Sequence, residues 1–143
     1  MTDYPDRRGL ERLKLNSFTG SEQNYSEYIA FLQRYGVKPG AKVFDFGCSW
    51  GYGSYQMNKA GYDVQSYEIG VERRNYGINN LGVNHIDDPY AIQAGHPLHE
   101  SFDCFFSAHF LEHVPSPKQN NRPRLAVSET RRYIYSVYAK RLP

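Results

Sequence analysis

A segment of alternating small residues, about a third of the way along the chain, restricts its fold more than any other feature. A β-prone segment at residues 43–46 comes first, and a helical pattern over residues 53–60 follows. Between and around them, small or acidic residues stand at alternate positions, as Asp45, Gly47, Ser49, Gly51 and Gly53. Glycine allows tight turns and close ligand approach because it lacks a Cβ atom. The amino end of a helix also favours a carboxylate or phosphate. The loop therefore predicts a ligand site between a strand and a helix.

Strands and helices alternate beyond residue 41. Short apolar runs predict strands over residues 43–46, 64–69, 83–86 and 102–107, and helical patterns cover residues 53–60 and 71–81. This alternation favours an α/β fold, a Rossmann-like, doubly wound and mostly parallel sheet. Ligands of such sheets bind beyond the carboxyl ends of the strands, which is where the informative residues of this chain cluster.

Residues 1–40 precede the sheet and form a predicted helical lead-in. Residues 1–20 are polar and predict no more than a short helical turn. Apolar residues at helical spacing then predict one helix within residues 21–36. Its expected cap is Ser21 or Asn24, and Gly36 is expected to end it in a left-handed conformation.

The loop does not match the dinucleotide fingerprint Gly-x-Gly-x-x-Gly. Counted from Gly51 the sixth position is Gln56, and counted from Gly47 the third is Ser49. The loop instead resembles motif I of class I S-adenosylmethionine-dependent methyltransferases, in which alternating glycines follow an acidic residue; here Ser49 replaces the middle glycine. Two further segments resemble the same family in the same order, namely residues 67–69 (Tyr-Glu-Ile) and residues 102–114, which end in Leu-Glu-His-Val. The resemblance covers residues 41–117.

The resemblance implies a reaction and a role for each matched residue. The chain would transfer a methyl group from S-adenosyl-L-methionine to an acceptor that the sequence does not identify. Glu68 would accept both ribose hydroxyls through its two oxygens, and Ile69 would pack on the adenine. Asp45 would orient the loop or accept a hydrogen bond from the cofactor's amino group. The loop residues implied to contact the cofactor are Asp45, Phe46, Gly47, Cys48, Ser49 and Gly51.

Residues further along complete the implied site. Asp87 or Asp88 would meet the adenine amino group. Near the methyl donor the pocket would be lined by Ser107, Ala108 and His109. His109 and His113 are the candidate general bases, since histidine titrates near neutrality. Alignment of donor and acceptor often suffices for methyl transfer, so this base is optional.

Structural interpretations compete with these roles. Glycines in a strand-to-helix turn can serve packing alone, Glu68 can be a solvated strand end, and the pair at 87–88 can make a turn with Pro89. Trp50 can be a cofactor lid or a half-buried aromatic residue. Residues 109–113 (His-x-x-Glu-His) also match a zinc pattern, but Pro115 leaves about one helical turn for it, so no metal is expected.

The basic tail at residues 118–143 departs from the family resemblance. Residues 1–117 hold 10 Lys and Arg against 14 Asp and Glu, whereas residues 118–143 hold 7 against a single Glu. We expect the tail to be an altered end on a truncated sheet that is incomplete at its carboxyl end, because the composition shifts where the family motifs end. The alternatives are a compact variant, or a basic arm for nucleic acid or acidic lipid. The last stretch of the tail can form at most one more element, an amphipathic helix or a strand. A sheet that stops at residues 102–107 would expose a bare apolar edge and favour self-association.

These observations leave three functions open: a methyltransferase, a catalytically inactive cofactor-binding fragment, and a nucleic-acid-binding module that uses the tail. Two cysteines without a secretory signal predict free thiols, Cys48 filling space rather than acting as a nucleophile. No apolar run approaches the roughly 20 residues of a membrane span. A cytoplasmic location is therefore expected.

Overall fold

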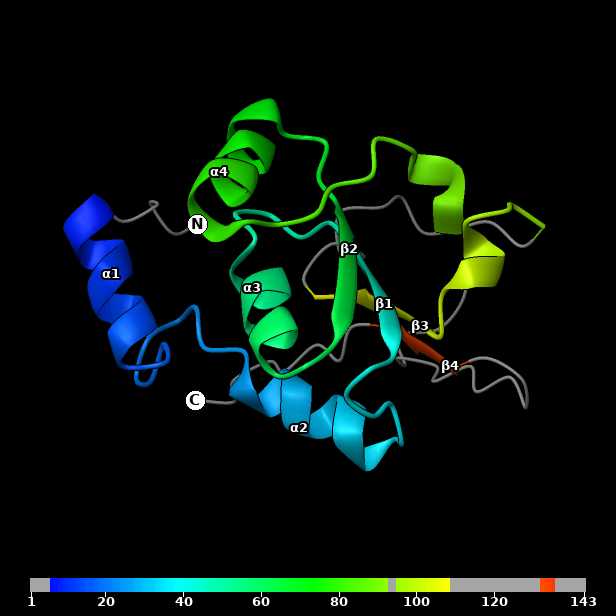
Figure 1. The fold of residues 1–143 in the computed structure, drawn as a ribbon, viewed down its shortest axis with the longest axis horizontal. Helices are drawn as coiled ribbons and strands as arrows, with labels where there is room; N and C mark the ends of the chain where they lie inside the picture. Colours follow the sequence, from blue (N-terminus) through cyan, green and yellow to red (C-terminus); the bar gives the residue numbers. More distant parts are fainter. Residues whose placement is uncertain (1–5, 93–94, 109–131, 136–143) are drawn as a thin grey trace, which may run out of the picture.

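A computed structural model describes residues 6–92, 95–108 and 132–135 of the chain. Its centre is a sheet with the strand order β2-β1-β3-β4, in which every neighbouring pair runs parallel (Figure 1). The strands are β1 (Lys42–Phe46), β2 (Asp63–Tyr67), β3 (Cys104–Ser107) and β4 (Arg132–Tyr135). The predicted α/β class with a parallel, Rossmann-like sheet is confirmed.

Within the described residues, four α-helices and two short 3₁₀ helices accompany the sheet. They are α1 (Arg7–Leu15), α2 (Ser26–Arg34), α3 (Tyr52–Lys59), α4 (Val71–Leu81), η1 (Pro89–Ile92) and η2 (His99–Ser101). The helices expected after residue 21 are present, and Gly36 has the predicted left-handed conformation, with φ 79°. The predicted cap of α2 by Ser21 or Asn24 is wrong, because the helix begins later, with Tyr25 at the cap position, and the Tyr25 side chain makes no capping hydrogen bond. Residues 6–20 hold a longer helix than the predicted single turn, and Asp6 caps its amino end by accepting from the N–H of Gly9 at 2.7 Å. No helix of the described residues is long and apolar enough to span a membrane.

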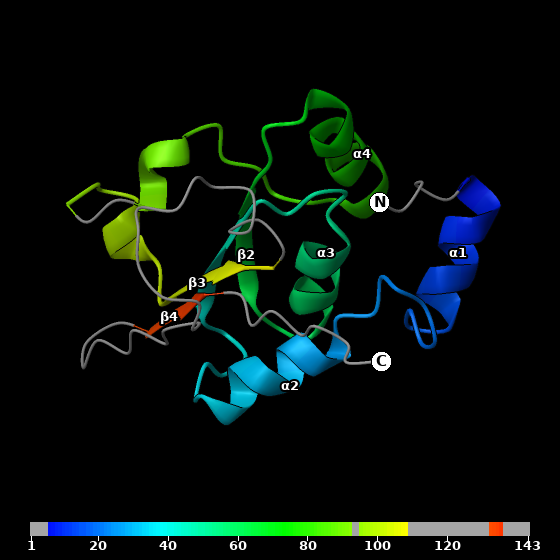
Figure 2. The ribbon, with the colours of Figure 1, turned by 180° about the vertical axis from the view of Figure 1, so that it is seen from behind.

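The helices and the 3₁₀ segment lie on opposite faces of the sheet. On one face, Leu32 of α2 and Met57 of α3 pack on Val43, Val64 and other strand residues. On the other face, Ala91, Phe102 and their neighbours pack on Phe44 and Phe105. Figure 2 shows the same arrangement from behind, with α4 above α3 and α1 at the right. A third cluster, around Leu10, Trp50 and Leu81, joins α1 and α4 to the loop after β1.

The strand predicted over residues 83–86 is wrong. In the structure a single bridge joins His85 to Ser66 of β2. The pairing with β2 does not extend to Val83, because this residue donates its N–H to Gly77 O of α4 at 3.1 Å and packs in the cluster around Trp50. The turn at Asp88 ends it on the other side.

The bare apolar edge predicted at residues 102–107 is also wrong. β3 pairs with β1 on one side and with β4 on the other, so it lies inside the sheet. The tail therefore contributes one strand, which was among its expected structures. The expected self-association rested on an unpaired β3, so this reason for expecting it no longer applies.

Candidate functional site

The loop after β1 is fastened to the end of β2 by its backbone. The N–H groups of Gly47 and Cys48 both donate to Tyr67 O, at 2.8 and 3.0 Å. The next N–H, that of Ser49, donates to Glu68 Oε2 at 2.9 Å. Because three consecutive N–H groups of the loop donate to residues 67 and 68, the loop and the end of β2 form one continuous edge.

Glu68 is the centre of this edge. Its Oε1 accepts from the N–H of Gly70 at 2.7 Å, while Oε2 accepts from Ser49. The residue is only 6% exposed, so the interpretation as a solvated strand end is wrong. Two backbone donors hold the carboxylate in one orientation, and each oxygen keeps a second acceptor position for a ligand hydroxyl.

Asp45 is buried beneath the loop rather than open to a ligand. The Ser54 hydroxyl donates to Asp45 Oδ2 at 2.5 Å, and the Ser66 hydroxyl donates to Ser54 Oγ at 2.8 Å. Burial raises the pKa of Asp45 to about 7, the Ser54 hydrogen bond opposes this shift, and the charge of Glu68 adds to it. The chain Asp45–Ser54–Ser66 joins β1, α3 and β2, which fits the expected role of orienting the loop.

The small residues of the loop have a packing reason as well. Gly51 has φ 88°, and a Cβ atom there would lie 2.7 Å from Val83 Cγ2. A Cβ atom on Gly53 would overlap the ring of Tyr25. Packing alone therefore explains these two glycines. Ser49 has φ 54°, a conformation that costs a residue with a Cβ atom about 1–2 kcal/mol.

His85 belongs to the site and was missed by sequence reasoning. Its Nε2 accepts from the N–H of Glu68 at 2.9 Å, its Nδ1 lies 3.3 Å from Asp87 Oδ1, and its ring stacks on Tyr67. Burial lowers the pKa of His85, while Asp87 opposes that shift. The residue lay in an expected third strand, and only its position two residues before Asp87 could have drawn attention to it.

The two acidic side chains at 87–88 have different partners. Asp87 has a mostly exposed side chain that accepts from Arg74 Nη1 at 3.2 Å. Asp88 accepts from the N–H of Tyr90 at 2.9 Å and lies 2.9 Å from His96 Nε2, so it makes the expected turn at Pro89. Contact with the adenine stays a prediction for both.

The remaining predicted residues lie along the carboxyl ends of the strands. Ile69 is 72% exposed directly after Glu68, where an aromatic ring could cover it. Ser107 and Ala108 are buried at the end of β3, and within the described residues Ser107 Oγ has no hydrogen-bond partner. Phe46 stacks on Tyr67, and Cys48 is buried. The candidate bases His109 and His113 lie outside the described residues.

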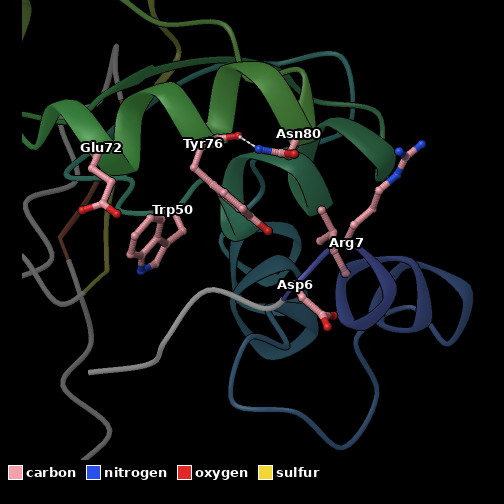
Figure 3. Close-up of a pocket in the computed structure, with 7 residues that line it drawn as sticks. Asp6, Arg7, Trp50, Glu72, Tyr76 and Asn80 are labelled. Carbon is pink, nitrogen blue, oxygen red and sulfur yellow. Dashed lines mark hydrogen bonds between the residues drawn. The ribbon is translucent and has the colours of Figure 1, made fainter.

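A pocket of about 290 Å³ lies apart from these strand ends, between α1 and α4. Figure 3 shows the Trp50 indole on one wall and Tyr76 on another, with Arg7 and Asp6 across from them. Trp50 is 8% exposed and meets Tyr76 edge-on at 5.4 Å, so it is a core aromatic residue rather than a lid. None of the residues predicted to bind the cofactor lines this pocket.

The described residues hold no group of three His, Cys, Asp or Glu side chains that could bind a metal ion. The zinc-like pattern at residues 109–113 lies outside them. Cys48 and Cys104 are buried thiols that form no disulfide, as predicted. Burial raises the pKa of Cys48 well above its ordinary value, as does the charge of Asp45.

No protein-family model and no curated protein matches the chain. Solved structures do match its fold. A protein from Methanococcus maripaludis, provisionally described as an S-adenosyl-L-methionine-dependent methyltransferase, has a TM-score of 0.53 at 11% identity, over 82% of this chain and 57% of that one. Magnesium protoporphyrin IX methyltransferase from Synechocystis PCC 6803, solved with bound S-adenosylmethionine, has a TM-score of 0.50 at 20% identity. The match covers 80% of this chain and 54% of that one.

A third match, from Galdieria sulphuraria, is provisionally described as a sarcosine dimethylglycine methyltransferase. Its TM-score is 0.50 at 18% identity, and the match covers 62% of this chain and 36% of that one. Identities at this level establish the fold. The chain therefore has the fold of S-adenosylmethionine-dependent methyltransferases, and it spans 36–57% of the length of the three structures.

Proposed function

We propose that this chain binds S-adenosyl-L-methionine at the carboxyl ends of β1, β2 and β3 and belongs to a methyltransferase whose acceptor is unidentified. The observation that carries the proposal is the carboxylate of Glu68, which Ser49 and Gly70 hold through backbone N–H groups at 2.9 and 2.7 Å. A buried carboxylate with both oxygens oriented and further acceptor capacity suits a vicinal diol.

Three other features of the site fit this cofactor. Ile69 offers a largely exposed apolar surface next to Glu68, suited to the face of an adenine. Ser107 Oγ is buried without a partner among the described residues, and a buried hydroxyl normally finds one. The loop from Gly47 to Gly51 keeps its backbone close to the strand ends, so the methionine part could lie along it.

In this arrangement the residues bind and orient rather than react. The cofactor, when bound, supplies an electrophilic methyl group for an acceptor nucleophile. Glu68 would fix the ribose, Ile69 would cover the adenine, and the buried Asp45–Ser54 pair would keep the loop in place. Such fixed orientation is itself a large part of catalysis for a transfer between two bound groups.

Isothermal titration with S-adenosylmethionine and with its demethylated product tests the proposal. We expect both to bind the folded chain, and Glu68→Ala to weaken binding by about 1–3 kcal/mol, as expected for hydrogen bonds to a charged group. Glu27→Ala, a change on the exposed side of α2, is the matched control and should leave affinity unchanged. No heat with either ligand, on protein shown to be folded, would refute the proposal.

Activity is a separate question that the same protein can answer. Binding without turnover on any tested acceptor would favour the inactive, cofactor-binding fragment. The tail hypothesis has its own test, because binding of nucleic acid by a basic arm must weaken steeply with salt.

A further inference from the structure

His85 contacts the backbone of Glu68 through one nitrogen of its ring. Its Nε2 faces the backbone of Glu68 at two atoms, 2.9 Å from the N–H nitrogen and 3.3 Å from the carbonyl oxygen. For the shorter contact Nε2 must carry no proton, since the Glu68 N–H is the donor. The proton of the neutral ring then sits on Nδ1, which lies 3.3 Å from Asp87 Oδ1.

The surroundings of His85 hold this tautomer in place. Asp87 Oδ1 also accepts from Arg74 Nη1 of α4 at 3.2 Å, so the carboxylate is anchored from a second element. On the β2 side the ring stacks on Tyr67 with centroids 5.9 Å apart and planes at 28°. The charged groups that face His85 are therefore Asp87, Arg74 and the Glu68 carboxylate.

We propose that neutral His85 positions Glu68 and that protonation of His85 releases it, which makes cofactor binding at this site sensitive to acid. Protonation places a hydrogen on Nε2, directly against the Glu68 N–H. Nε2 can then donate only to Glu68 O, while Nδ1 still faces Asp87, so the Nε2 contact moves from one backbone atom of Glu68 to the other. The backbone of Glu68 carries the carboxylate that also holds Ser49 and Gly70. A shift there disturbs both oxygens.

The effect on the cofactor rests on the function proposed above, whereas the coupling of His85 to Glu68 does not. His85 is a positioning residue in this scheme, since it acts through Glu68. Its side chain is only 6% exposed and burial lowers its pKa, so the neutral form dominates near neutral pH.

The first experiment uses the free protein with ¹⁵N-labelled histidine and backbone. We expect Nδ1 of His85 to be protonated and Nε2 to be an unprotonated acceptor at about pH 7.5, and the Glu68 amide signal to move with the same midpoint as the His85 ring. A ring protonated on Nε2, or a Glu68 amide that ignores the His85 titration, would overturn the proposal whether or not any ligand binds.

The second experiment measures S-adenosylmethionine affinity between about pH 7.5 and pH 5.5 in the wild type, His85→Gln and His85→Phe. The Gln amide oxygen can accept from Glu68 without titrating, and Phe keeps the stack on Tyr67 without an acceptor. We expect the affinity of the wild type to fall about tenfold or more between about pH 7.5 and pH 5.5. His85→Gln should not show the part of this fall that comes from His85. His85→Phe should bind weakly at every pH. Asp45 titrates in all three proteins, so its contribution cancels in the comparison.

The two experiments separate the two proposals. Identical pH profiles in the wild type and His85→Gln would overturn the role of His85 while leaving cofactor binding intact. The expected nuclear magnetic resonance result with no binding in the wild type at any pH would refute the proposed cofactor and leave the coupling of His85 to Glu68 standing.

Discussion

The backbone N–H of Ser49 donates to Oε2 of Glu68 at 2.9 Å. The two residues are 19 positions apart in the sequence, and this bond joins the loop after β1 to the end of β2. It uses the backbone of Ser49 rather than its side chain. The loop can therefore tolerate a serine at this position, provided that the backbone reaches a left-handed conformation.

Ser49→Gly should stabilise the protein. Ser49 has φ 54°, which costs about 1–2 kcal/mol with a Cβ atom and little without one. The extra freedom of glycine in the unfolded chain offsets part of this gain, so we expect an increase in the free energy of unfolding of up to about 1 kcal/mol in urea titrations. Ser49→Val should instead lower the free energy of unfolding. A loss of stability in Ser49→Gly would contradict the strain at this residue.

Gly51→Ala should destabilise the protein more than its backbone conformation alone explains. The added methyl group would lie 2.7 Å from Val83 Cγ2, in addition to the strain of φ 88°. Gly82→Ala is the matched control, because Gly82 has φ 65° and a methyl group added there would meet no atom within 4 Å. We expect Gly51→Ala to cost about 1–3 kcal/mol beyond the control in urea unfolding. Equal costs would show that the loop yields to the methyl group.

Asp45→Asn should flatten the pH dependence of stability. Burial raises the folded-state pKa of Asp45 to about 7, above its ordinary value of 3.8. Its protonated form is therefore favoured by folding, and the stability that it contributes is complete below pH 3.8 and lost as the pH rises through 7. The neutral amide keeps an acceptor for Ser54 and does not titrate. The variant should match the wild type in acid and exceed it above neutral pH in urea titrations; a constant difference would contradict the raised pKa.

Ile69→Ala should weaken cofactor binding without reducing stability. The side chain is 72% exposed, so its truncation removes little packing in the free protein. If the adenine covers it, the lost apolar contact should cost about 1 kcal/mol of binding, or about fivefold in affinity. Val71→Ala, at a 58% exposed position on α4, is the control for calorimetry and thermal melting. Unchanged affinity in Ile69→Ala would place the adenine elsewhere.

Local patterns along the chain predicted the elements well. The alternation of strands and helices requires only side-chain periodicity and turn residues, and it correctly located α3, α4, β1 and β2 within about two residues. The position of Glu68 at the end of β2 was predictable in the same way. The role of His85 was not predictable in this way. Its bond to the Glu68 N–H exists because the bridge between His85 and Ser66 brings the ring next to the end of β2.

The order of residues alone thus specified a parallel α/β sheet with a glycine loop and an acidic strand end at one edge, since these follow from short-range conformational preference. Three features depended on contacts between distant segments. These are the burial of Asp45 under the Ser54 hydroxyl, the pairing of β3 with β4, and the hold of His85 on Glu68. A hydrogen bond or a burial energy arises only once two segments are brought together in space, so no local pattern in either segment records it.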